Sequence, residues 1–227
     1  MIHLETVDPC GLHNFMHIVK TPPFICSLKK QLAGDLPGRS AQLKLAPVPK
    51  SKELYPPTRK IAIKSAVLIL LFPEGGDWLF FLTERSHNVE HHQGQISLPG
   101  GAMEEGESFQ DTALRETEEE LGVDTSVIEV IGELTPLFIP VSGFEVHPIV
   151  GWSGVIPQIK PDTVEVDRVY KVSLKELCRP DVIKKENRTI GGYSVTVPFF
   201  DFPDVEVWGA TATILSEFKE ILPRLDF

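Results

Sequence analysis

The feature that most constrains this chain is a glycine-rich turn that runs into a helix ending in a dense group of carboxylates, within residues 94–123. Glu116, Glu119 and Glu120 are spaced i, i+3 and i+4, so on a helix their side chains leave from one face. Like charges at this spacing destabilise a helix by about 0.2–0.5 kcal/mol per pair, which predicts a compensating cation. Carboxylate oxygens suit Mg²⁺ or Mn²⁺, and we expect the three glutamates to bind one of these ions.

The same stretch has the signals of an amphipathic helix from Ser108 to Leu121, with Gly122 as its stop. Ala113, Leu114 and Leu121 fall mostly opposite the glutamates, so this side of the helix should bury against a sheet. Thr117 lies among them, and we expect its hydroxyl to hydrogen-bond back within the helix.

Several residues of this stretch stand at fixed offsets, namely Gly101, Glu107, Arg115, Glu116, Glu119, Glu120, Gly122 and Val123. They resemble the Nudix box, G-x5-E-x7-R-E-U-x-E-E-x-G-U, in which U is an aliphatic residue. The one departure is Thr117, which stands where the pattern has a bulky aliphatic residue. The resemblance implies an α/β (α+β) Nudix fold with a mixed β-sheet sandwiched between α-helices.

The resemblance also implies roles for the residues of the box. Glu116 and Glu120 would be the principal metal ligands, Glu119 would complete the set, and a main-chain carbonyl near Gly100 would join them. Arg115 and Glu107 would orient the glutamates, and Gly101 and Gly122 would be structural. In many Nudix enzymes a further acidic residue reaches the metals from a loop, and the candidates for it here are Glu165 and, as a reserve, Asp162. The group that accepts the proton from water stays open among Glu116, Glu119 and Glu165.

The residues upstream of the box narrow the expected substrate. Leu82, Thr83, Arg85, Ser86, Gly94 and Pro99 to Gly101 match a signature that resembles that of coenzyme A diphosphatases in the Nudix family. Glu90 replaces an arginine of that signature and Leu98 replaces a phenylalanine. Arg85 either forms a surface ion pair or binds a substrate phosphate, because a guanidinium matches phosphate oxygens. We interpret His87, His91 and His92 as solvated loop residues.

Two later segments also resemble this coenzyme A group. The run from Val141 to Gly151 places Phe144 where it would either line the substrate cavity or belong to the core. The run from Trp208 to Ala212 is similar to a W-G-x-T-A motif, which we interpret as a packing element.

The rest of the chain predicts alternating strands and short helices. Residues 64–84 indicate a hairpin whose first strand is buried, and residues 141–156 indicate a second hairpin-forming pair. A short helix is expected from Ser27 to Ala33 and a long one at the C-terminal end. We expect an N-terminal extension in residues 1–60, packed on a Nudix domain in residues 61–227, with residues 43–60 as an extended connector.

Composition limits the classes of partner. The net charge is −10 without a basic block, which argues against nucleic acid and acidic membranes as partners. No apolar run approaches the length of a membrane span, and no signal pattern is visible at the start. Cys10, Cys26 and Cys178 are odd in number and widely spaced, as in reduced structural thiols. We therefore expect a cytoplasmic protein; a homodimer is possible, since many Nudix proteins form one.

The predicted function is metal-dependent hydrolysis of the diphosphate of coenzyme A or acyl-coenzyme A to 3′,5′-ADP and 4′-phosphopantetheine or its acyl form. Bound divalent ions would neutralise the diphosphate, orient it and lower the pKa of a water molecule. One alternative is hydrolysis of another nucleoside diphosphate derivative, such as ADP-ribose, a nucleotide sugar or a dinucleoside polyphosphate. A second alternative is a non-catalytic nucleotide sensor, although such a protein would not need all three glutamates.

Overall fold

The computed structural model describes residues 21–49, 62–86, 94–190 and 192–222. The expectations for Cys10, His87, Glu90, His91 and His92, and for most of the 43–60 connector, lie outside these residues. Within the described parts, no helix is both long and apolar enough to cross a membrane.

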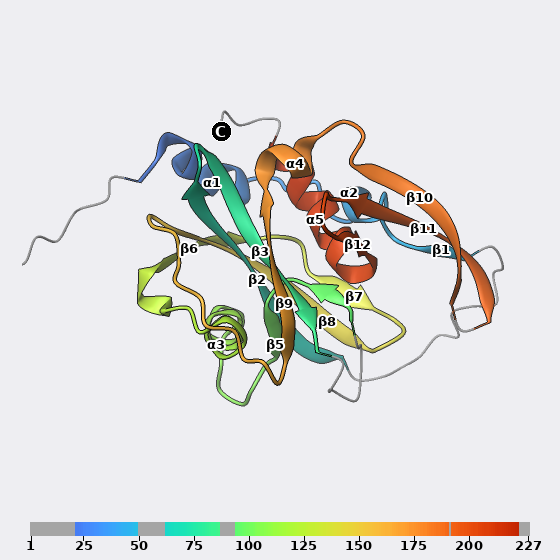
Figure 1. Ribbon diagram of the computed structural model, residues 1–227, viewed down its shortest axis with the longest axis horizontal. Coiled ribbons are helices and arrows are strands. Elements are labelled where there is room, and N and C mark those ends of the chain that lie inside the picture. Colours follow the sequence, from blue (N-terminus) through green and yellow to red (C-terminus); the bar gives the residue numbers. More distant parts are fainter. Residues whose placement is uncertain (1–20, 50–61, 87–93, 191, 223–227) are drawn as a thin grey trace, which may run out of the picture.

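A mixed sheet forms the centre of the molecule (Figure 1), with the strand order β4-β3-β2-β8-β6. β2 pairs with β8 in parallel and with β3 and β5 antiparallel. β9 joins β3, and β7 joins β8 beside β6. The strands span Ile63–Glu74 (β2), Asp77–Arg85 (β3), Ile96–Ser97 (β4), Gly100–Ala102 (β5), Ile128–Glu133 (β6), Leu137–Ile139 (β7), Phe144–Ser153 (β8) and Val166–Ser173 (β9).

A smaller antiparallel sheet extends from one side of the molecule (Figure 1). Its strands are Val48–Pro49 (β1), Ile183–Ile190 (β10), Tyr193–Asp201 (β11) and Glu206–Trp208 (β12). The helices of the chain span Pro23–Leu32 (α1), Arg39–Gln42 (α2), Phe109–Leu121 (α3), Leu174–Cys178 (α4) and Gly209–Ile221 (α5), and a 3-10 turn (η2) spans Thr125–Val127.

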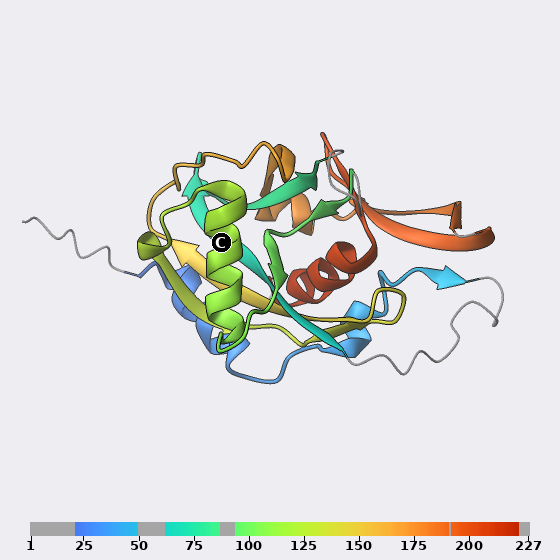
Figure 2. The same ribbon diagram turned by 90° about the horizontal axis from the view of Figure 1, so that it is seen from below.

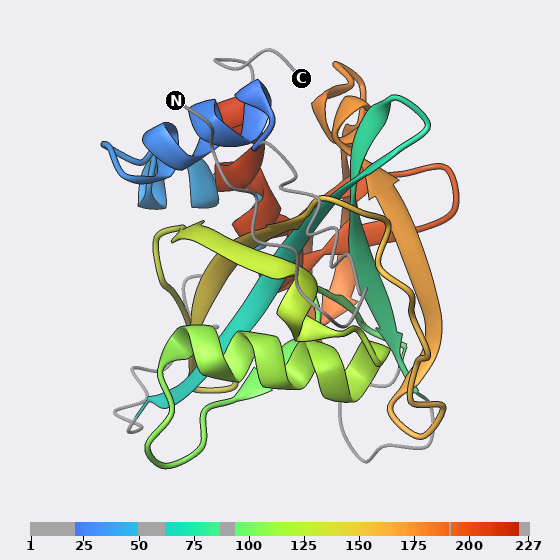
Figure 3. The same ribbon diagram turned by 90° about the vertical axis from the view of Figure 1, so that its left-hand side faces the viewer.

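Helices cover both faces of the central sheet, as Figures 2 and 3 show from two sides. Side chains alternate along β2, so Leu68 and Leu70 face α3 and pack with its Ala113 and Leu121. The intervening residues Ile69 and Leu71 face the other way, into a core shared with α1 and α5; that core includes Phe24, Leu28, Leu215 and Phe218. This arrangement confirms the predicted mixed sheet between helices.

The segment before the sheet contributes directly to that second core. α1 begins at Pro23, four residues before the predicted start, because Phe24 and Ile25 are also buried. Glu217 of α5 is fully buried and accepts hydrogen bonds from the Gly38 amide, the Gln42 side chain and the Thr135 hydroxyl. The division of the chain at residue 60 stays a prediction.

The hairpin predicted in residues 141–156 is wrong, because β8 is one continuous strand. Pro148 lies inside this strand, where the neighbour of β8 changes from β7 to β6. At that point Pro148 only accepts a hydrogen bond, from the Leu134 amide at 2.9 Å. Its missing N–H is therefore tolerated inside the strand.

Candidate functional site

The helix α3 places the carboxylates, and its two ends are fixed by local interactions. Ser108 and Asp111 form a reciprocal capping box at its start. Gly122 ends it in the left-handed conformation with φ +65°, where a Cβ would lie 2.6 Å from the Lys160 carbonyl oxygen. The Thr117 hydroxyl donates to the Ala113 carbonyl at 2.7 Å, as predicted.

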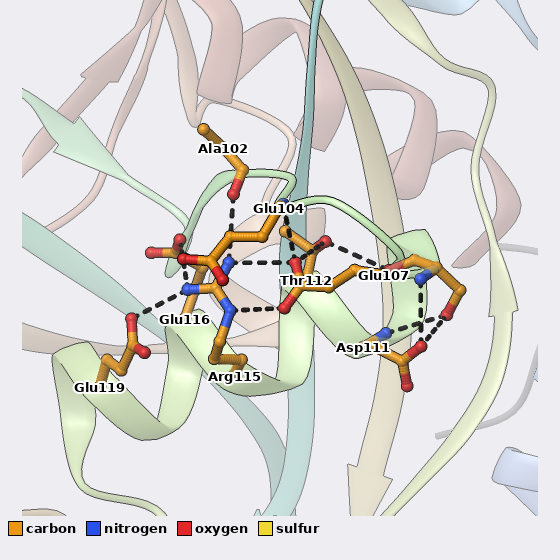
Figure 4. Close-up of polar contacts among 9 residues, drawn as sticks. Ala102, Glu104, Glu107, Asp111, Thr112, Arg115, Glu116 and Glu119 are labelled. Atoms are coloured by element: carbon orange, nitrogen blue, oxygen red, sulfur yellow. Dashed lines mark hydrogen bonds and ion pairs between the residues drawn. The ribbon is translucent and has the colours of Figure 1, made fainter.

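Arg115 connects the glutamates of the box (Figure 4). Its Nε donates to Glu107 at 2.6 Å, and its Nη1 donates both to Glu116 at 2.8 Å and to Glu119 at 3.0 Å. These hydrogen bonds raise the pKa of Arg115 and, with the Glu104 amide and the Thr112 hydroxyl, lower the pKa of Glu107 to about 2. Glu107 is thus a permanent anion that holds Arg115 in place beside Glu116.

Glu120 is buried, with 5% of its surface exposed, and its carboxylate accepts one hydrogen bond from the Gly100 amide at 3.3 Å. Burial raises its pKa to about 8; Glu116 and Glu165 add to the rise, and the Gly100 amide and Arg85 oppose it. Burial also raises the pKa of Glu116, although Arg115 opposes that rise. Negative charge is therefore costly in this cluster unless a cation joins it.

A pocket of about 520 Å³ opens beside the cluster. Glu116, Glu165, Arg85 and the glycine pair Gly100–Gly101 line it, together with Phe144. A second hollow of about 530 Å³, between β9 and the Phe202–Val205 loop, contains none of these carboxylates. The first pocket is therefore the candidate active site.

Two glycines let the backbone approach the glutamates. At Gly100, a Cβ would lie 2.3 Å from the Ala66 carbonyl oxygen, and at Gly101 it would lie 2.4 Å from the Glu116 carboxylate. The close contact at Gly101 involves only the end of a flexible side chain. A substitution there should displace Glu116 without breaking the fold.

We expect Gly101→Ala to lower kcat/KM at least about tenfold while changing the melting temperature little, because it moves a carboxylate off its position. Steady-state kinetics and thermal melts of the purified protein check this result. Gly34→Ala is the matched control, since a Cβ there meets only ordinary contacts at 3.6 Å and beyond. An active Gly101→Ala protein would contradict the role of this contact.

Glu165 reaches the pocket from the loop before β9. The Ser86 amide donates to the Glu165 carbonyl at 2.8 Å, and the Asp162 amide donates to the Glu120 carbonyl at 3.0 Å. These bonds tie the loop to β3 and to α3. The Asp162 carboxylate accepts from the Val164 amide at 2.8 Å and does not line the pocket, so Asp162 shapes the turn.

Some predicted site residues lie elsewhere. The Ser86 side chain is completely buried and does not line the pocket; its described link to the site is the main-chain bond to Glu165. The Glu119 side chain is 59% exposed and contacts Arg115 (Figure 4), because residues one apart on a helix point about 100° from each other. Among the described residues, no three Asp, Glu, His or Cys side chains form a ready metal cage. The roles of Ser86 and Glu119 stay predictions.

The donor set nevertheless fits a divalent cation. Glu116, Glu120 and Glu165 influence one another electrostatically, and the buried Glu120 carboxyl has a strongly raised pKa. Oxygen donors of this kind suit hard cations such as Mg²⁺. The assignment of Glu116 and Glu120 as metal ligands stays a prediction.

The raised pKa of Glu120 predicts how stability depends on pH in metal-free protein. The folded state holds this proton up to about pH 8, whereas the unfolded chain releases it near 4.5, so stability falls as the pH rises through this window. Glu120→Gln removes the effect. We expect the variant to melt at a higher temperature than the parent, by a margin that widens from about pH 5 to about pH 9. Thermal melts in a chelator check this prediction, and a constant margin would contradict it.

Sequence reasoning missed the wall that α5 adds to the pocket. Ala210, Thr211 and Ile214 line it opposite the sheet. The W-G-x-T-A resemblance was the available signal, but its interpretation as packing was incomplete. The contact joins residues more than a hundred positions apart, which the sequence pattern alone does not reveal.

Comparison with known proteins assigns the family. A model of the NUDIX domain matches residues 62–190, which is more than half of the chain. The chain belongs to the Nudix family. The predicted box and the predicted fold class are confirmed with it.

Several Nudix relatives are similar in sequence. "Nudix hydrolase 15, mitochondrial" of Arabidopsis thaliana is 34% identical over 77% of this chain and 62% of its own length. An uncharacterized Nudix hydrolase, NudL, of Photorhabdus laumondii is 30% identical over 79% of this chain and 92% of its own length. "Nudix hydrolase 3" of Caenorhabditis elegans is 34% identical over 63% of this chain and 60% of its own length. The chain spans about three-fifths of the length of the Arabidopsis and nematode proteins.

Proposed function

We propose that this Nudix protein hydrolyses the diphosphate linkage of coenzyme A or acyl-coenzyme A, yielding 3′,5′-ADP and 4′-phosphopantetheine or its acyl form. The observation that carries the proposal is the pocket in which Glu116 and Glu165 meet Arg85 beside the buried Glu120. The upstream residues Leu82 to Ser86 and Gly94 to Gly101, which resemble the coenzyme A signature, support the choice of substrate.

Each residue has a role in this proposal. Glu116 and Glu120, with the Gly100 carbonyl, hold Mg²⁺ or Mn²⁺. When bound, such an ion would supply charge neutralisation for the diphosphate and would lower the pKa of a water molecule. Glu165 accepts the proton of the attacking water, because it lines the pocket on a loop fixed by the Ser86 amide. Arg85 binds a phosphate through its planar guanidinium, which matches phosphate oxygens.

A substrate panel tests the proposal. Coenzyme A, octanoyl-coenzyme A, dephospho-coenzyme A, ADP-ribose and a dinucleoside tetraphosphate are each incubated with Mg²⁺ or Mn²⁺, and the products are separated chromatographically. We expect the highest kcat/KM with coenzyme A or its acyl form. Faster cleavage of ADP-ribose would favour the alternative that the Glu90 departure leaves open. Ligand binding without metal-dependent cleavage of the diphosphate would instead indicate a sensor.

A further inference from the structure

The wall formed by α5 lies outside the part of the chain that the NUDIX model matches, because α5 begins at Gly209 and the match ends at residue 190. Figure 2 shows α3 and α5 on opposite sides of the central strands. This wall brings Ala210, Thr211 and Ile214 to the same pocket that Glu116 lines from α3. The C-terminal segment therefore forms one side of the candidate active site.

The pocket lining combines charged and uncharged side chains. The charged side chains among its described lining residues are Arg85, Glu116 and Glu165. All three influence the pKa of the buried Glu120. The uncharged lining includes the apolar residues Val67, Leu98, Phe144, Val146, Ala210 and Ile214, together with the polar Ser65, Gln95, Ser97 and Thr211 and the residues Gly100 to Ala102. None of the lining residues from α5 is charged, so this wall suits an uncharged part of a substrate, since an unpaired charge there would lose its hydration.

The α5 wall is rigid. The Thr211 hydroxyl donates to the Ile96 carbonyl at 2.9 Å, which fixes the first turn of α5 to β4, shortly before Gly100. Residues 211–218 are all buried. About one and a half turns further along the helix, the Ser216 hydroxyl donates to the Ala41 carbonyl at 2.8 Å and Glu217 accepts a hydrogen bond from Gln42. A wall held at two points limits the size of the group it accepts.

We propose that the first turn of α5 is the specificity element of this pocket and receives the uncharged, pantetheine-side portion of the substrate, with any acyl chain. This inference rests on the proposed function. The other portion of coenzyme A carries a 3′-phosphate, and the described residues of the α5 wall offer it no cationic side chain. Ala210 sets the available space, because its small side chain faces the pocket at the start of the helix.

Binding of the two product halves tests the inference without requiring turnover. The affinities of S-octanoyl-4′-phosphopantetheine and of 3′,5′-ADP are measured by calorimetry in Mg²⁺ for the parent protein and for Ala210→Leu. We expect Ala210→Leu to lower the affinity for the octanoyl ligand at least about tenfold and to change the affinity for 3′,5′-ADP less than about twofold. The inference would be overturned if the affinities for both ligands fell equally, if only the affinity for 3′,5′-ADP fell, or if neither changed. It would also be overturned if the parent protein did not bind the octanoyl ligand.

A matched pair on α5 separates a wall residue from a core residue. Ile214→Ala and Leu215→Ala both remove buried aliphatic volume, but only Ile214 lines the pocket. We expect Ile214→Ala to shift the affinity ratio of octanoyl to unacylated phosphopantetheine and Leu215→Ala to leave that ratio unchanged. If both shift it equally, the wall has no selective role. If the binding pattern holds but coenzyme A is not cleaved, the proposed function fails and the subsite remains.

Discussion

Glu120→Gln is expected to lower kcat by about three orders of magnitude or more and to leave the fold intact. The substitution keeps the volume of the side chain and its contact with the Gly100 amide, but removes the negative charge of a carboxylate that is 5% exposed. Loss of several kcal/mol of charge stabilisation corresponds to that change in rate, at about 1.4 kcal/mol per factor of ten. Single-turnover and steady-state assays with Mg²⁺ measure it.

Glu118→Gln is the matched control for this experiment. Glu118 lies on the same helix, is exposed and does not line the pocket. We expect this control to retain the parent rate. Should Glu120→Gln also retain it, the assignment of Glu120 as a metal ligand would be wrong, and the enzymatic proposal would lose its main support.

Glu217→Ala is expected to destabilise the protein by about 3 kcal/mol or more, with a fall in melting temperature on the order of 10 °C. The variant leaves the Gly38 amide, the Gln42 side chain and the Thr135 hydroxyl without their buried acceptor. Each such group costs about 1–3 kcal/mol when it is buried and unsatisfied. Denaturant unfolding measures the change in free energy.

Glu220→Ala provides the comparison on the same helix. Glu220 pairs with Lys44, but the Lys44 side chain is 62% exposed and that of Glu220 is 30% exposed. Such pairs contribute at most about 1 kcal/mol. If the two variants lose similar stability, the buried contacts of Glu217 do not hold the N-terminal segment as described.

Local signals predicted the elements that local interactions determine. Ser108 and Gly122 marked the ends of α3 because a capping box and a left-handed residue act within one turn. The β2–β3 hairpin followed from the apolar run and the glycines between its strands. The box glutamates were also visible in the sequence, since their spacing is fixed by the helix.

Contacts between distant segments were not predictable in this way. Three glutamates on one helical face suggested a common site, but α3 packing buries Glu120 and leaves Glu119 beside Arg115 in solvent. Ser86 matched a substrate signature, yet its side chain is completely buried just after β3 ends. The predicted hairpin in residues 141–156 was wrong because the sequence does not show that β8 changes its neighbour from β7 to β6 along one continuous strand.

Glu217 accepts hydrogen bonds from the Gly38 amide and the Gln42 side chain, and this clasp has a consequence for how the protein could diverge. α5 transmits the position of that clasp along about 10 Å of buried helix, from Glu217 to Ala210, to the residues that line the pocket. Mutations at the clasp can therefore retune which molecules are accepted while the catalytic carboxylates stay untouched. Selectivity could evolve here through contacts about two helical turns from Ala210, at residues that do not line the pocket.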